Sequence, residues 1–98
     1  MNPARRPRAH LFVCENRREG SPLGPGCGGR GEAVFAELKR EVGQRGLTYD
    51  VWVTRTRCLG VCPAVGTAVA IYPRGGLLTE VVASDAAALL RRAHEENV

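Results

Sequence analysis

Four cysteines in a chain of 98 residues limit the fold of this protein more than any other feature of its sequence. Gaps of twelve, thirty and three residues separate them, at Cys14, Cys27, Cys58 and Cys62. The basic start of the chain is followed only by the apolar run Leu11-Phe12-Val13, which is too short for the core of a signal peptide. We therefore expect a cytoplasmic protein, in which reducing conditions disfavour disulfides and favour metal or redox uses of cysteine.

The positive charge of the chain is concentrated at its N-terminus. The formal net charge is +4, and residues 1–18 alone carry five arginines against one glutamate. Nucleic-acid binding needs basic residues clustered on a folded face, so we expect no nucleic-acid partner. We predict a basic flexible tail over residues 1–8 and one folded domain over residues 9–98. No apolar stretch approaches the ~20 residues of a spanning helix, so membrane insertion is not expected.

The hydrophobic pattern predicts the element order strand, helix, strand, strand, strand, helix. Strands are expected at 9–14, 49–54, 67–72 and 77–82, and helices at about 32–44 and from Ser84 onward. A right-handed crossover makes the first two strands parallel, and the turn at 73–76 adds an antiparallel hairpin. The predicted fold class is α/β: a thioredoxin-like, mixed four-stranded sheet (βαβ then ββα) with helices packed on the sheet.

All four cysteines lie at the ends of predicted elements. Cys14 ends the first strand, Cys27 precedes the first helix in a loop rich in glycine and proline, and the other two follow the second strand. The carboxyl ends of parallel strands and the start of the crossover helix share one edge of such a sheet. We therefore expect the four thiols to converge at that edge.

Four converging thiolates need a cation, and zinc and iron–sulfur clusters are the species that accept them. Glycines around Cys27 favour a cluster, because they let backbone N–H groups approach sulfur closely. Structural zinc sites mostly use tight cysteine pairs, and only Cys58 and Cys62 form one here. The sequence has no C-x-x-C motif of the thioredoxin type. A zinc-stabilised binding module with four cysteine ligands and a thiol-based redox protein stay open as alternatives.

Several short segments resemble the thioredoxin-like [2Fe–2S] ferredoxins, a family related to the small two-iron subunit of NADH:quinone oxidoreductases. They are Phe12-Val13-Cys14, Cys27-Gly28, Cys58-Leu59-Gly60-Val61-Cys62 and the strand and turn from Val69 to Gly75. The chain differs from the family at Gly66-Thr67 and at Leu77-Leu78-Thr79. The resemblance implies a homodimeric electron carrier, not an enzyme, that serves a reductase and an acceptor enzyme. It implies a [2Fe–2S] cluster on Cys14, Cys27, Cys58 and Cys62.

Other candidate features carry less weight. The run from Gly24 to Gly29 matches G-x-G-x-x-G with Asp50 downstream, but it does not directly follow a strand. His10 and His94 could serve as metal ligands, yet both lie outside the cysteine loops.

Two pairs of residues are candidates for contact with other proteins. Trp52 and Tyr72 lie on predicted strands, where packing is the default and a dimer or partner surface the alternative. Arg55 and Arg57 could add positive potential beside Cys58. Weak redox encounters use small interfaces, so the loop edge around Cys27 and Cys58 is the expected docking surface.

Overall fold

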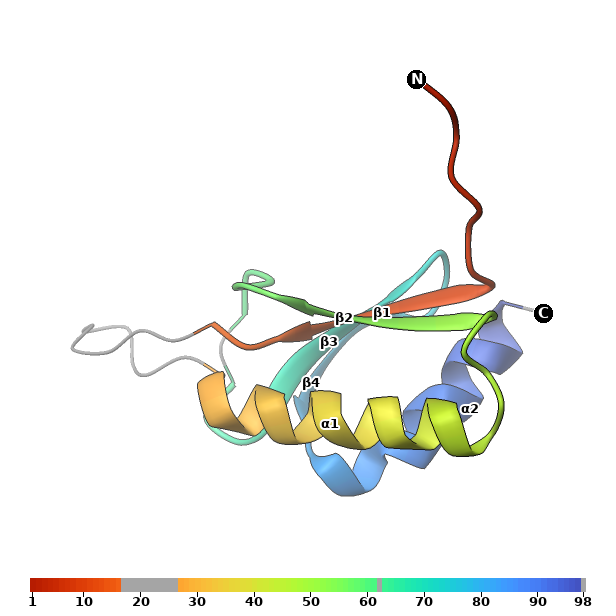
Figure 1. The fold of residues 1–98 in the computed structure, drawn as a ribbon. Helices are drawn as coiled ribbons and strands as arrows, with labels where there is room; N and C mark the ends of the chain where they lie inside the picture. Colours follow the sequence, from red (N-terminus) through yellow and green to blue (C-terminus); the bar gives the residue numbers. More distant parts are fainter. Residues whose placement is uncertain (17–26, 62, 98) are drawn as a thin grey trace.

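The computed structural model describes residues 1–16, 27–61 and 63–97. Within these residues four strands form one sheet in the order β2-β1-β3-β4 (Figure 1). Strand β1 pairs parallel with β2 and antiparallel with β3, and β3 pairs antiparallel with β4. The strands are β1 (Ala9–Cys14), β2 (Val51–Thr56), β3 (Thr67–Tyr72) and β4 (Gly76–Val81). This arrangement confirms the predicted mixed sheet and its α/β class.

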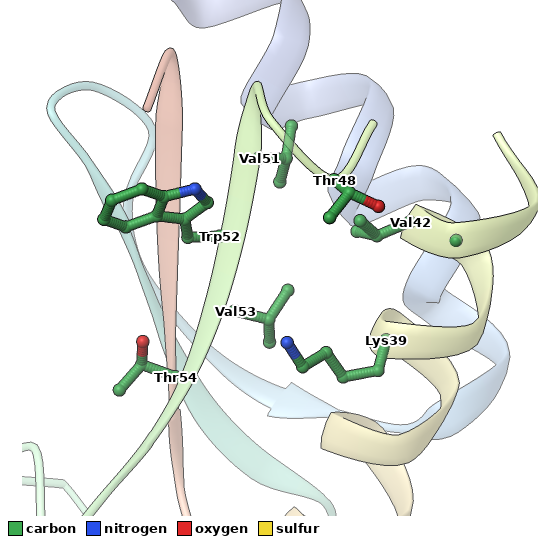
Figure 2. A pocket seen from close by; sticks show the side chains of 8 residues that line it. Lys39, Val42, Thr48, Val51, Trp52, Val53 and Thr54 are labelled. Atoms are coloured by element: carbon green, nitrogen blue, oxygen red, sulfur yellow. The ribbon is translucent and has the colours of Figure 1, made fainter. Parts of the chain in front are cut away.

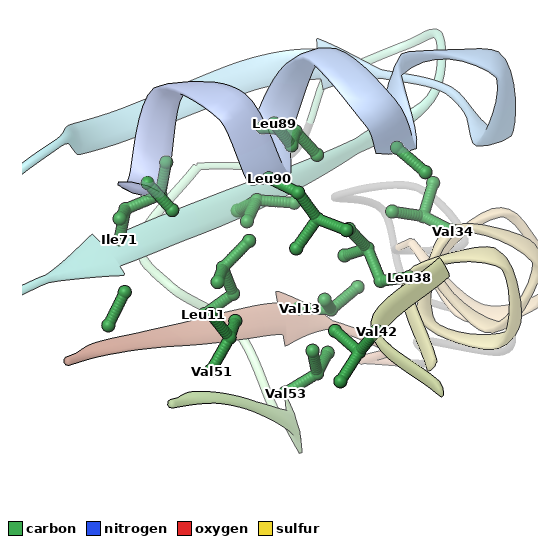
Figure 3. Close-up of a cluster of buried hydrophobic side chains, with 14 of the residues drawn as sticks. Leu11, Val13, Val34, Leu38, Val42, Val51, Val53, Ile71, Leu89 and Leu90 are labelled. Atoms are coloured by element: carbon green, nitrogen blue, oxygen red, sulfur yellow. The ribbon is translucent and has the colours of Figure 1, made fainter. Parts of the chain in front are cut away.

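The helices α1 (Gly28–Gln44) and α2 (Ala86–Glu96) pack on the same face of the sheet (Figure 1). A short 3-10 turn, η1 (Ala83–Asp85), leads into α2. Alternate strand residues meet the apolar stripes of these helices in one core, which includes Leu11, Leu38 and Leu90 (Figure 3). Each of these three side chains is fully or almost fully buried. The opposite face of the sheet is covered by none of the described helices.

The start of α1 differs from the prediction. The helix begins at Gly28, directly after Cys27, and not at about residue 32. Glycine has low helix propensity, so the pattern indicated a loop here. The reason for glycine is close packing: a Cβ on Gly31 would overlap the carbonyl oxygen of Cys14. The absence of a side chain therefore lets the first turn of α1 approach the end of β1.

The predicted start of the second strand, at residue 49, is wrong by two residues. Tyr49 lies in the turn before β2 and is largely exposed, and β2 continues to Thr56. Tyrosine favours strands in general, but here the main-chain N–H groups of Asp50 and Val51 both bond to the carbonyl of Leu47. This turn joins α1 to β2.

Candidate metal centre

The carboxyl end of β1 and the start of α1 position the first two cysteines. Cys14 is the last residue of β1, and Cys27 is the residue that caps the N-terminus of α1. Their exposed fractions are 0% and 1%, and their thiols are close enough to hydrogen-bond. Ala68 on β3 completes this buried cluster, and Leu59 and Val61 pack against it. Two of the four thiols that were expected to converge thus lie together, and the full ligand set stays a prediction.

Cys58 lies in the segment that follows β2, beside this pair. It is exposed, whereas Cys14 and Cys27 are buried. Cys62 lies outside the described residues. Among the residues that the structure does describe, no group of three His, Cys, Asp or Glu side chains is already assembled around a common point. The structure thus brings together two of the four predicted ligands and places a third in the adjoining loop.

Main-chain N–H groups surround these sulfurs. Asn16 and Leu59 both direct backbone hydrogen bonds at the Cys14 thiol, and the N–H of Gly60 donates to Cys58 Sγ at 3.3 Å. Gly60 has a φ of 96°, a conformation that favours glycine. Hydrogen bonds of this kind stabilise thiolate and cluster sulfur.

The protonation of Cys14 follows from its burial. Desolvation raises the pKa of the Cys14 thiol, and the neighbouring Cys27 raises that pKa further. The backbone N–H groups of Asn16 and Leu59 act in the opposite direction. Two adjacent buried thiolates therefore need a cation to offset their charge, as in a metal site. Paired buried thiols, N–H donors to sulfur and a glycine at close approach together fit an iron–sulfur cluster.

A hydroxyl and a guanidinium hold the backbone around the cysteines in place. The buried side chain of Thr67 donates to the carbonyl of Cys14 at 2.7 Å. Arg30, in the first turn of α1, donates to the carbonyl of Ala64 in the segment after Cys62. The helix is thereby tied to the second cysteine loop. Sequence reasoning missed both residues, because neither belongs to a ligand motif.

Glu15 and Arg55 place opposite charges next to the cysteines. The Glu15 side chain is only 12% exposed, and Arg55 Nε lies 3.3 Å from its Oε2, an ion-pair contact without hydrogen-bond geometry. The same guanidinium lies over the ring of Phe35, 4.4 Å from its centroid. Arg55 was a predicted source of positive potential beside Cys58, and in the structure its charge is partly balanced by Glu15.

The competing sites find no support in the described residues. Gly28 and Gly29 are helical, and Asp50 is exposed in the turn before β2, while Gly24 lies outside the described residues. His10 bonds to Thr54 on the sheet face opposite the helices, with Nε2 and Oγ1 2.6 Å apart. His94 lies in the last turn of α2. Neither histidine accompanies the cysteines.

A pocket of about 280 Å³ opens between α1 and the edge strand β2 (Figure 2). Apolar side chains such as Val42 and Val53 line it, and Lys39 extends across its mouth. The residues that line this pocket include no cysteine, histidine or carboxylate. It therefore offers no set of metal ligands, and the cysteine edge remains the candidate site.

Comparison with known proteins identifies relatives of the whole chain. No family model matches it. A protein from Clostridium pasteurianum described as "Ferredoxin, 2Fe-2S" is 30% identical over 92 residues, which are 93% of this chain and 88% of that protein.

Solved structures that resemble this chain are also [2Fe–2S] ferredoxins. The wild-type thioredoxin-like [2Fe–2S] ferredoxin from Aquifex aeolicus superposes with a TM-score of 0.78 at 26% identity, over 95% of this chain and 93% of that one. A Cys-to-Ser variant of the same protein gives a TM-score of 0.77 at 25% identity, over 92% of each chain. The sheet and helices described above are thus those of the thioredoxin-like ferredoxin fold.

Proposed function

Because the chain belongs to the [2Fe–2S] ferredoxin family, we propose that its four cysteines hold the cluster and that it carries single electrons from a reductase to an acceptor enzyme. Ferredoxins are electron carriers that bind such a cluster, and they work with redox partner proteins without catalysing a substrate reaction. The proposed ligands are Cys14, Cys27, Cys58 and Cys62. The observation that carries this assignment is the contact between the buried thiols of Cys14 and Cys27.

The second cysteine loop supports the rest of the ligand set. Leu59 bonds to Cys14 through its backbone N–H and packs on the buried thiols, and it stands next to Cys58 in sequence. Cys62 follows three residues later in the same segment. The loop that carries Cys58 and Cys62 is thereby anchored beside the thiols of Cys14 and Cys27.

A bound cluster would supply the ability to take up and release one electron. The protein holds and tunes that chemistry. Main-chain N–H groups of Asn16, Leu59 and Gly60 stabilise negative charge on sulfur. The side chains of Leu59 and Val61 cover the buried thiols and limit access of water. Hydrogen bonding, burial and the charges of Glu15 and Arg55 would together set the reduction potential.

Electrons would enter and leave at the edge that carries Cys58. Cys58 is exposed, whereas Cys14 and Cys27 are buried, so among the described cysteines it brings a proposed ligand sulfur to the surface. Arg57 is exposed in the same segment. A small, weak interface here suits a carrier that must dissociate after each transfer.

The proposal includes an assembly and a location. Residues 9–98 form the ferredoxin domain and residues 1–8 a basic extension, and resemblance to the family supports a homodimer. The use of cysteine as a metal ligand supports a cytoplasmic location. Neither α1 nor α2, the α-helices among the described residues, is both long and apolar enough to cross a membrane. Sedimentation velocity would measure the dimer, and a monomer at micromolar concentration would contradict it.

The decisive experiment is purification without air followed by metal and sulfide analysis. The ferredoxin proposal expects a reddish-brown protein with about two irons and two sulfides per chain, and visible bands that bleach on reduction. A colourless protein with one zinc per chain would establish the zinc-stabilised module instead. A folded, metal-free protein that exchanges disulfides with a dithiol would establish the thiol-based alternative.

A further inference from the structure

The sheet face opposite the helices carries a continuous aromatic cluster. The rings of His10 and Phe12 stack with centroids 4.1 Å apart. Trp52 meets His10 edge-on at 5.7 Å, and Tyr72 meets Phe12 edge-on at 5.5 Å. These residues come from β2, β1 and β3, and their Cα registers place His10 between Trp52 and Tyr72. Trp52 is 37% exposed and Tyr72 57% exposed, so this cluster faces the surface.

The N-terminal segment turns this aromatic face into a groove. Residues 3–8 form one wall, the aromatic cluster forms the floor, and together with Pro73 they enclose about 1010 Å³. Arg5, Arg6 and Arg8 stand in the wall, and the Arg5 guanidinium also lies 5.9 Å from the ring centroid of Tyr49. The described residues that line the groove include no aspartate or glutamate. The segment predicted as a tail thus lines a concave, cationic and aromatic surface.

We propose that this groove binds an extended acidic segment of a partner protein. Arginine pairs with carboxylates through two parallel hydrogen bonds, and three unbalanced arginines would match a run of acidic side chains. Aromatic rings with a partly exposed surface give apolar side chains of the same segment a place to pack. Tryptophan, tyrosine and arginine are also the residues that most often dominate binding energy at protein interfaces.

Charge favours an acidic segment over a second copy of the chain as the occupant of the groove. A second copy of the chain, packed face to face on the groove, would bring two sets of three arginines together without lining carboxylates to balance them. A single-stranded nucleic acid would satisfy the arginines, but it binds by stacking bases on open aromatic faces. The stacked contact with His10 occupies one face of Phe12, and an oligonucleotide in the titration below tests whether the exposed rings of Trp52 and Tyr72 stack bases.

The groove and the cysteine edge lie at opposite ends of β1. His10 is the second residue of that strand and Cys14 its last, and the N-terminal segment extends from the end remote from α1's first turn (Figure 1). A partner held in the groove would therefore leave the cysteine edge open for electron transfer. Peptide binding in the groove does not depend on which metal the cysteines hold. The proposed function therefore stands even if the groove binds no peptide, and the groove can bind a peptide even if the cysteines hold no iron–sulfur cluster.

Calorimetric titration of the purified holoprotein with a synthetic peptide of alternating glutamate and leucine tests the groove. The acidic peptide should bind, and a peptide with lysine in place of glutamate should not. Trp52 is the single tryptophan of the chain, so its emission should change on binding. Replacing Arg5, Arg6 and Arg8 by glutamine should weaken binding about tenfold.

A matched variant carries the same charge change elsewhere on the surface. Arg40, Arg45 and Arg91 are exposed and lie outside the groove, so their replacement by glutamine should leave peptide affinity unchanged. Equal loss in both triple variants, or no binding of the acidic peptide, would overturn the proposal. Tighter binding of a single-stranded oligonucleotide would identify a different occupant. A dimer that the Trp52→Ser variant abolishes would identify a second copy of the chain.

Discussion

The backbone N–H of Leu59 donates to the sulfur of Cys14, so the loop that carries Cys58 closes on the strand that ends at Cys14. This bond joins the two cysteine loops through a residue that is not itself a ligand. It also places the covering side chain of Leu59 over the buried thiols. The following predictions test how the chain builds and uses this site.

Replacement of an exposed proposed ligand should release the cluster. Cys58→Ala should lower iron content and visible absorbance, because alanine offers the cluster no ligand atom. Ser84→Ala, a small change at an exposed residue of η1, serves as the control and should retain both. Iron analysis and absorbance spectra measure the effect. Full iron content in Cys58→Ala would remove Cys58 from the ligand set.

Gly31→Ala should destabilise the protein. The new Cβ would overlap the carbonyl of Cys14, and relieving that overlap should cost about 1–3 kcal/mol. The matched variant is Gly43→Ala in the last turn of α1, where a Cβ meets nothing within 4 Å. It should be neutral or stabilising by up to about 1 kcal/mol. Urea unfolding of both variants measures the difference, and equal stability would disprove the close contact.

Glu15→Gln should raise the reduction potential. The substitution removes a mostly buried negative charge next to Cys14 and leaves the positive charge of Arg55 uncompensated. Both changes favour the reduced, more negative centre, and the shift should be on the order of tens of millivolts. Glu95→Gln on the exposed surface of α2 is the control. A redox titration followed by visible absorbance that gave the same potential for Glu15→Gln and wild type would contradict this role.

Stability should fall as the pH drops below 6.5 through the effect of His10. Burial lowers the pKa of the His10 imidazole below its ordinary value of 6.5. The unfolded chain therefore takes up a proton first, and stability is lost from about pH 6.5 down to the lowered pKa of the folded state. Thermal unfolding between pH 5 and 8 measures this slope. His10→Gln should flatten it, with His94→Gln as a histidine substitution elsewhere.

Arg57 should influence association with redox partners. Arg57→Gln should change the rate of electron transfer to a partner and its dependence on ionic strength, because exposed charges steer encounter. Arg91→Gln removes the same charge from the exposed side of α2 and should change neither. Stopped-flow reduction at several salt concentrations makes the comparison. Identical salt dependence for Arg57→Gln and wild type would place Arg57 outside the docking surface.

Local patterns predicted the element order, the parallel β1–β2 pair and the β3–β4 hairpin, because strand alternation and the turn at 73–76 can be recognised locally. They did not predict the antiparallel pairing of β1 with β3. The start of α1 was predicted too late, because the glycines there indicated a loop. Gly31 is instead required by its close contact with Cys14, which is distant in sequence. Local patterns also could not predict the ion pair of Glu15, because its partner Arg55 lies on β2, the strand that pairs with β1. Residues 3–8 line the groove together with Trp52 and Tyr72, which are distant in sequence, so local patterns could not predict this arrangement.

The main chain at Cys14 is fixed from several sides: β2 and β3 flank its strand, Thr67 bonds to its carbonyl, and Gly31 packs against the same oxygen. An electron carrier works quickly when its surroundings move little as charge arrives and departs. A backbone that is already held in place, with dipoles already oriented, needs little reorganisation. If Cys14 holds the cluster as proposed, the buried hydroxyl of Thr67 would contribute to the speed of transfer, although it lies outside the proposed ligand set.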